Sequence, residues 1–101
     1  MKEKDKNNIL SAIMDIKNVL HDSGEKYYED SFDKYYNALY NAKSDKEYQA
    51  AIRCCLRIFS GGMGSYNDMV LYKEGSPNKE NNNILKILNK KLYLMLTKAI
   101  A

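Results

Sequence analysis

The 101-residue sequence has little of what interrupts helices or crosses membranes. It contains one proline and five glycines, and it has few of the β-branched runs that are typical of strands. No stretch approaches the roughly 18 apolar residues of a membrane span, and the polar segment 1–8 lacks the apolar run of a signal peptide. We therefore expect a helical protein of the cytoplasm, with no membrane among its partners.

Residues that build reactive sites are equally scarce, with two cysteines and one histidine. Cys54 and Cys55 are adjacent, a spacing that strains a disulfide and cannot form the framework of a secreted domain. His21 would have to serve any Ser-His-Asp or Cys-His chemistry, but a histidine near a helix end also stabilises the helix dipole. These residues do not supply the separated ligand pairs of a zinc site. We expect no enzyme activity, no catalytic residues, no metal and no cofactor.

What is present is a short chain with an uneven charge distribution. A chain of this length forms one domain, which we place at residues 1–101. The formal net charge is +3, yet the segment 22–33 holds five acids and one lysine, whereas the segment 73–101 holds six lysines and two acids. The sequence predicts either a bipolar molecule or two ordinary solvated helix faces.

Apolar residues recur at helical spacing in four segments, which predicts an all-α fold. The first helix is expected from residue 5 or 7 to 23, with Gly24 as its terminating residue, and the second at 25–42. We expect a small bundle of about four helices with a glycine-rich turn after the third helix. A two-helix hairpin that dimerises is a less economical alternative.

The later segments carry clearer boundary signals. Ser44 and Glu47 form a capping box, which predicts that the third helix begins there and continues to the glycines at 61–62. We expect a short helical turn at 69–72 and an exposed connection at 73–83, in which Pro77 could also open a helix. The last helix is expected from residue 80 or 83 to 99.

The loop after the third helix is the most unusual segment of the chain. It lacks the lysine of a phosphate-binding Walker loop and follows a predicted helix instead of a strand, so we interpret it as mainly structural. Its glycines can end the helix with positive φ, Ser65 or Asn67 can cap the next turn, and Met63 can fill the core. The alternative is a direct ligand or partner contact through residues 65–68. The loop consists of Gly61, Gly62, Met63, Gly64, Ser65, Tyr66, Asn67 and Asp68.

Tyrosine is abundant, with nine in the chain, and five of them fall on the second helix. Because these five point to different sides of a helix, at least one or two should be exposed beside the acidic residues. Exposed tyrosines among carboxylates are typical of a protein-binding face. An equally simple interpretation is that they line a thin core. The five are Tyr27, Tyr28, Tyr35, Tyr36 and Tyr40.

The segment from Phe59 to Leu71 resembles the signature of a family of small bacterial helical proteins of unknown function, with Gly-Gly-Met-Gly-Ser, an aromatic residue and Asn-Asp. Members of that family resemble the immunity proteins of contact-dependent and polymorphic toxin systems. The resemblance implies stoichiometric inhibition of a cognate bacterial toxin, possibly a nuclease, with no catalytic residues. An acidic, tyrosine-bearing helix suits the basic cleft of such a toxin. The candidate contact residues are Glu25, Tyr28, Glu29, Asp30, Asp33 and Tyr36.

Three other function classes remain open at this stage. The chain could be a structural or regulatory interaction module, as a monomer or weak homodimer. It could be a small enzyme or nucleotide binder that uses the glycine loop. Nucleic-acid binding would require Lys86, Lys90, Lys91 and Lys98 to line up on the last helix, and we do not expect a nucleic-acid partner.

Overall fold

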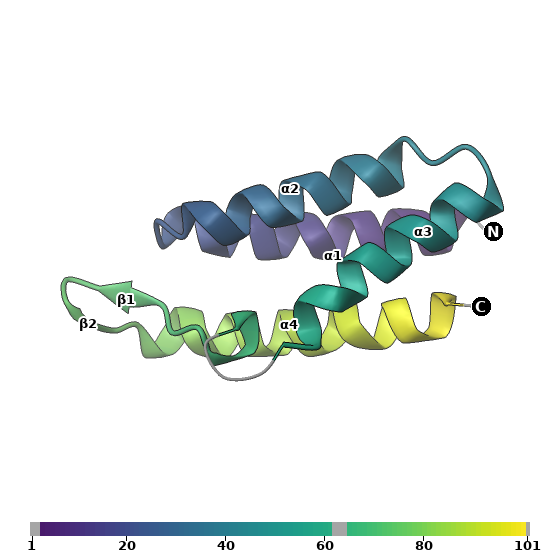
Figure 1. The fold of residues 1–101 in the computed structure, drawn as a ribbon. Helices are drawn as coiled ribbons and strands as arrows, with labels where there is room; N and C mark the ends of the chain where they lie inside the picture. The colour runs from purple at the N-terminus through teal and green to yellow at the C-terminus, as the bar shows by residue number, and fades with distance from the viewer. Residues whose placement is uncertain (1–2, 62–64, 101) are drawn as a thin grey trace.

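Four α-helices form the bundle that the sequence predicts. The computed structural model describes residues 3–61 and 65–100, and Figure 1 shows their arrangement. Helices α1 and α2 lie side by side and antiparallel, α4 packs on another side of α1, and α3 crosses from α2 towards α4. The helices are α1 (Glu3–Asp22), α2 (Lys26–Tyr40), α3 (Asp45–Leu56) and α4 (Lys79–Ala99).

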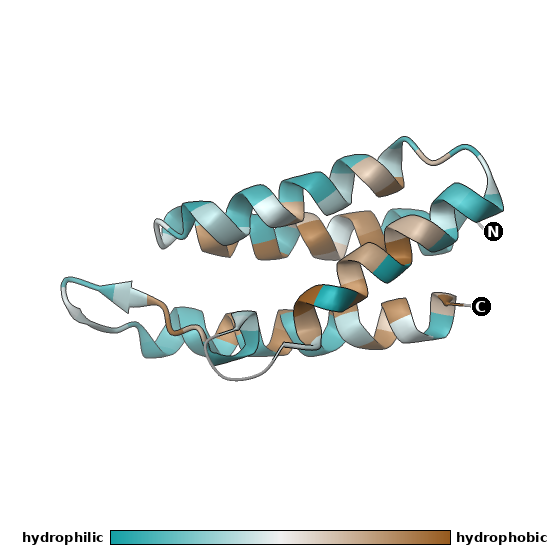
Figure 2. Ribbon diagram, in the orientation of Figure 1, coloured by the Kyte–Doolittle hydropathy of each residue, from teal (hydrophilic) through white to brown (hydrophobic). Residues whose placement is uncertain are grey.

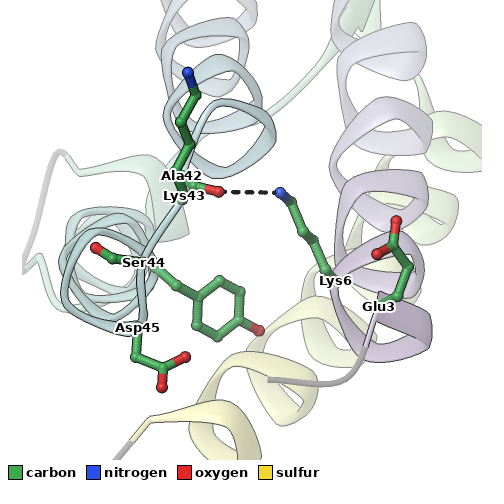
Figure 3. Close-up of a pocket in the computed structure, with 7 residues that line it drawn as sticks. Glu3, Lys6, Ala42, Lys43, Ser44 and Asp45 are labelled. Atoms are coloured by element: carbon green, nitrogen blue, oxygen red, sulfur yellow. Dashed lines mark hydrogen bonds between the residues drawn. The ribbon is translucent and has the colours of Figure 1, made fainter.

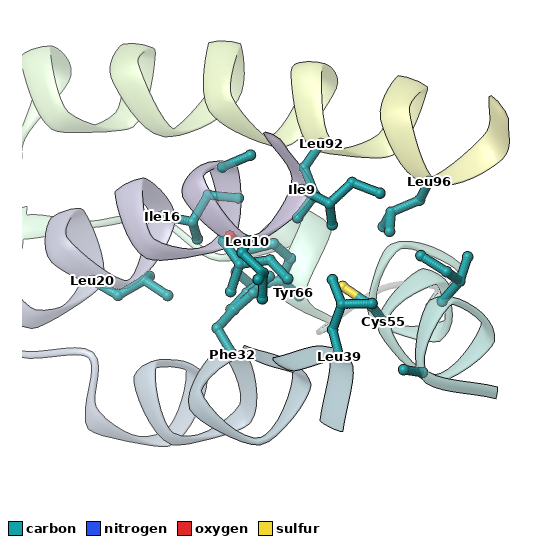
Figure 4. Close-up of a cluster of buried hydrophobic side chains, with 14 of the residues drawn as sticks. Ile9, Leu10, Ile16, Leu20, Phe32, Leu39, Cys55, Tyr66, Leu92 and Leu96 are labelled. Atoms are coloured by element: carbon teal, nitrogen blue, oxygen red, sulfur yellow. The ribbon is translucent and has the colours of Figure 1, made fainter. Parts of the chain in front are cut away.

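The core lies between the helices because each contributes one apolar stripe at helical spacing. Helix α1 is central, and its buried apolar residues, which run from Ile9 to Leu20, lie between α2 and α4 (Figure 4). Helix α2 contributes Phe32 and Leu39, α3 contributes Ile52, and α4 contributes Leu92 and Leu96. Figure 2 shows hydrophobic residues recurring along α1, whereas α2 is mostly hydrophilic. Helix α2 therefore lies on the core with a narrow apolar stripe and leaves much of its surface to solvent.

Helix ends agree with their sequence signals. Gly24 has a φ of +73°, and its N–H donates to the carbonyl of His21 at 3.1 Å. The N–H of Glu25 donates to the carbonyl of Leu20 at 2.9 Å, which completes a Schellman motif. At α3, the Ser44 hydroxyl accepts from the N–H of Glu47 at 3.2 Å. The Glu47 carboxylate in turn accepts from the backbone N–H of Lys43 and not from that of Ser44.

Several boundaries differ from prediction. Helix α1 begins earlier, at Glu3, and α2 ends at Tyr40. The third helix ends at Leu56 and tightens into a 3₁₀ turn, η1 (Arg57–Phe59). Helix α4 begins at Lys79, not with Pro77, because the Asn78 side chain accepts from the N–H of Asn81 at 3.1 Å and caps the helix.

The predicted helical turn at 69–72 is wrong, because this segment is extended. A 3₁₀ turn, η2 (Tyr66–Asp68), precedes it, and β1 (Tyr72–Lys73) then pairs with β2 (Ser76–Pro77) in an antiparallel hairpin. Glu74 and Gly75 both have positive φ, as a tight two-residue hairpin turn requires. The amide of Asn82 accepts from the N–H of Leu71 at 2.7 Å and donates to its carbonyl at 3.0 Å. The Asn82 side chain thus forms hydrogen bonds with both backbone polar groups of Leu71, which lies in an extended segment.

Candidate functional site

Tyr66, the aromatic residue of the motif, is a core residue. Only 4% of it is exposed, and its ring lies 5.0 Å from that of Tyr28 and 5.3 Å from that of Phe32, between centroids. The hydroxyl donates to Asn89 Oδ1 at 2.8 Å, which connects the motif to α4. Burial raises the pKa of the Tyr66 hydroxyl well above its usual range, so it stays protonated. Tyr66 joins α2, η2 and α4, and it offers no surface to a partner.

The neighbouring motif residues hold the turn in shape. Asn67 donates its side-chain amide to the carbonyl of Phe59 at 2.7 Å across the loop. An added Cβ at Gly61 would overlap the side chain of Ser65, so glycine is needed there for close approach. A positive φ was predicted at Gly61 or Gly62; Gly61 does not have one, and Gly62 lies outside the described residues. Ser65 occupies the N-cap position of η2 but makes no side-chain capping bond.

Other predictions for this loop have different outcomes. Asn67 does not cap the next turn, because its amide bonds to Phe59 instead. Gly62, Met63 and Gly64 lie outside the described residues, so the predictions made for them have no structural counterpart. Asn67 and Asp68 are the exposed residues of η2. The described part of the motif is therefore mainly a joint between α3 and the rest of the bundle.

The six candidate contact residues on α2 do not form one outward face. Tyr28 and Tyr36 are half-buried and pack against the core, and Glu25 is half-buried at the N-cap position. Tyr36 also stacks on Tyr40, with ring centroids 6.2 Å apart, and Lys17 Nζ lies 5.8 Å from the centre of the Tyr36 ring. With Glu29, which is also half-buried, four of the six therefore turn partly towards the bundle.

Glu29, Asp30 and Asp33 each have a nearby basic side chain. His21 Nδ1 lies 3.0 Å from Glu29 Oε2, and Lys17 Nζ lies 2.6 Å from Asp33 Oδ1, so two pairs bridge α1 and α2. The third pair, Lys26 with Asp30 at 3.1 Å, lies within α2. The hydrogen bond and charge of Asp30 raise the pKa of Lys26. A partner would meet a less acidic surface than the sequence alone suggests.

Two tyrosines that were not among the six are the most exposed on α2. Tyr27 is 75% exposed and Tyr40 is 62% exposed, which confirms that at least one or two tyrosines of this helix face solvent. The helical wheel already carried this signal, since Tyr27 lies five residues before Phe32 and hence about 140° away from the buried stripe. The outer face of α2 consists of Tyr27, Asp30, Asp33, Lys34 and Tyr40.

A separate cleft of about 490 Å³ lies where the start of α1 meets the connection between α2 and α3. Lys6 Nζ donates there to the carbonyls of Tyr40 at 3.2 Å and Ala42 at 3.4 Å, and so caps the end of α2 (Figure 3). The buried Tyr48 hydroxyl has no hydrogen-bond partner among the described residues. Acidic and basic side chains are balanced, so the cleft selects no ligand by charge. Its lining is Glu3, Lys6, Ala42, Lys43, Ser44, Asp45 and Tyr48.

The two cysteines differ in environment. Cys54 is exposed, whereas Cys55 is buried, and burial raises the pKa of the Cys55 thiol to about 12. Within residues 3–61 and 65–100, no three or more His, Cys, Asp or Glu side chains are grouped as metal ligands. None of the helices formed by those residues has both the length and the apolar character needed to span a membrane.

Comparison with known families gives one match. A family described as a domain of unknown function (DUF6966) matches residues 21–78, which is more than half of the chain. The chain belongs to this family. The matched region begins at the last residues of α1 and includes all of α2 and α3, the motif segment and the hairpin. No curated protein and no solved structure matches the chain.

Proposed function

We propose that the protein is an immunity protein that binds a cognate bacterial toxin stoichiometrically in the cytoplasm. The observation that carries this proposal is the outer face of α2, where Tyr27 is exposed beside Asp30 at the start of the helix and Tyr40 is exposed at its end. Tyrosine is enriched at protein–protein contacts because it combines a large apolar ring with a polar end and few rotatable bonds. The matched family region contains the whole face.

The packing of α2 suits it to rigid binding. Phe32 and Leu39 anchor its inner side, and the contacts of Glu29 with His21 and of Asp33 with Lys17 tie it to α1. A helix held in this way loses little conformational entropy when a partner binds. We propose that the aromatic rings bury against the toxin and that Asp30 and Asp33 meet basic toxin residues. The pair of Asp30 with Lys26 is largely exposed, so exchanging Lys26 for a toxin cation costs little, whereas Asp33 keeps its bond to Lys17 and meets the toxin with its other carboxylate oxygen.

Co-expression with the toxin encoded by the neighbouring gene tests the function. The wild-type chain should protect cells, and purified protein should bind the toxin domain at a one-to-one ratio in calorimetry. A double variant, Tyr27→Ala with Asp30→Lys, should lose about two orders of magnitude in affinity, as expected for removing a central aromatic contact and reversing a charge. Lys4→Glu on α1, which also changes an exposed charge, serves as the matched control and should bind normally.

The two parts of the proposal fail differently. Absence of both protection and binding by the wild-type chain would rule out the immunity function. Tight binding that the double variant retains would keep the function but exclude the outer face of α2 as its contact. Circular dichroism and thermal unfolding of each variant separate a lost contact from a lost fold.

A further inference from the structure

Helix α4 has a second apolar surface opposite the one that it buries. Leu85 is buried, and Leu94, nine residues later, lies about 180° around the helix. Ile87 is 62% exposed and Leu94 is 49% exposed. Because seven residues separate them, they lie about 20° apart and form one line along the helix. We call Ile87 and Leu94 the α4 ridge.

Four lysines flank this ridge on both sides. On the helical wheel, Lys86 and Lys90 lie on one side of the ridge, and Lys91 and Lys98 lie on the other. All four are exposed, and none forms an ion pair within residues 3–61 and 65–100. The only acid of α4, Glu80, lies in its first turn. Its lysines thus differ from Lys17 and Lys26, whose charges are already matched by nearby carboxylates.

The pattern matches one side of a helix–helix contact. In heptad notation, the ridge residues occupy the a position, Lys90 occupies d, Lys91 and Lys98 occupy e, and Lys86 occupies g. Charges at e and g select the partner in such contacts, since opposite charges across the seam attract and like charges repel. A second copy of this chain would place lysine against lysine. Nucleic acid is also a poor fit, because the apolar ridge separates the lysines, which do not line up as phosphate contacts require.

We propose that the α4 ridge and its lysines dock an acidic amphipathic helix of a partner protein. The partner helix places apolar residues against Ile87 and Leu94 and carboxylates against the flanking lysines. This surface lies across α1 from the outer face of α2, so it can be occupied at the same time (Figure 1). The proposal does not depend on the toxin-binding function.

A pair of synthetic helical peptides tests the proposal with the full chain. Both carry leucine at a and d, and one carries glutamate at e and g where the other carries lysine. The glutamate peptide should bind with micromolar affinity in fluorescence anisotropy, and the affinity should fall as salt is raised. The lysine peptide should not bind. The double variant Lys91→Glu with Lys98→Glu should lower the affinity for the glutamate peptide by about tenfold or more and should allow the lysine peptide to bind.

Further variants separate the apolar contribution from the charges. Ile87→Gln with Leu94→Gln keeps helix propensity and should also reduce binding by about tenfold. Lys4→Glu, which makes a single exposed charge change on α1, should bind like wild type. Circular dichroism checks that every variant is folded.

Three results would overturn the proposal. One is equal binding, or no binding, of the two peptides by the wild-type chain. The second is preferential binding to phosphatidylserine vesicles without peptide binding, which would assign the ridge to a lipid surface. The third is a concentration-dependent dimer, seen in light scattering, that the Ile87→Gln and Leu94→Gln substitutions abolish, which would assign the ridge to self-association.

Discussion

The motif segment and helix α2 use tyrosine in opposite ways. Tyr66 of the motif is buried among aromatic rings and hydrogen-bonded to Asn89, whereas Tyr27 of α2 is largely exposed. The most distinctive stretch of the sequence is therefore a structural joint, and the less distinctive helix presents the surface. A rare sequence pattern here reflects steric demands on a turn, such as the close approach of Gly61 to Ser65.

This contrast makes the two regions separable by mutation. Changes in the motif should act mainly on the free energy of unfolding, because the side chains of Tyr66 and Asn67 bind other parts of the same chain. Changes at Tyr27 and Asp30 on the outer face of α2 should act mainly on partner affinity, because the side-chain contacts of these two residues lie within α2 itself.

The largest effect is expected from Tyr66→Ala. Removing a buried ring that contacts Tyr28, Phe32 and Phe59 leaves a cavity and strands the Asn89 amide. The free energy of unfolding should fall by about 3–5 kcal/mol, measured by urea denaturation. A loss below about 1 kcal/mol would mean that the motif is not the joint described here.

Asn82→Ala should have the next largest effect. The substitution removes both hydrogen bonds to the backbone of Leu71 and leaves its partly buried N–H unpaired, whereas its carbonyl keeps the bond from the N–H of Asn78 at 2.8 Å. We expect a loss of about 1–3 kcal/mol in urea denaturation, together with faster hydrogen exchange at the Leu71 amide. Asn83→Ala, at the exposed neighbouring position, is the control and should change stability little. Equal effects at both positions would contradict this role for Asn82.

Alkaline pH should lower the free energy of unfolding, because it ionises a thiol that is buried in the core. Burial raises the pKa of the Cys55 thiol from 9.0 to about 12 in the folded protein. The protonated thiol therefore contributes stability that is fully present below pH 9 and is lost as pH rises towards 12. Between pH 8 and pH 10 the free energy of unfolding should drop by about 1 kcal/mol from this group. Cys55→Ala should flatten that drop, whereas Cys54→Ala at the exposed neighbour should retain it. An unchanged slope in Cys55→Ala would refute the assignment.

Tyr27→Ala should have the smallest effect on stability. The side chain is mostly in solvent and packs only edge-on against Tyr28. We expect a change within about 0.5 kcal/mol in urea denaturation. A loss comparable to that of Tyr66→Ala would erase the distinction between the two regions.

Local signals predicted the helices well and the connection before α4 poorly. The capping box at Ser44 and the terminating Gly24 depend on a few neighbouring residues, so they can be recognised from sequence. The extended path at 69–72 depends instead on the Asn82 side chain, which reaches back 11 residues from α4. A contact of that kind exists only once the helix has docked, and short apolar runs do not reveal it.

The exposure of α2 was predicted for the helix as a whole and not for its individual residues. Composition correctly indicated that α2 exposes tyrosine, but choosing residues by charge selected Glu29 and Asp33, which pair with His21 and Lys17 of α1. Which basic side chains of α1 lie opposite these acids depends on the angle at which α1 and α2 pack. The sequence of α2 alone does not specify that angle.

Toxin affinity of Tyr27→Ala and Tyr66→Phe, measured beside their unfolding, tests the central claim most directly. Tyr27→Ala should weaken binding by at least about tenfold with unchanged stability. Tyr66→Phe loses the bond to Asn89 and should lower stability by about 1 kcal/mol while the folded protein binds the toxin normally. The reverse pattern, with normal affinity in Tyr27→Ala and weakened affinity in folded Tyr66→Phe, would contradict the account.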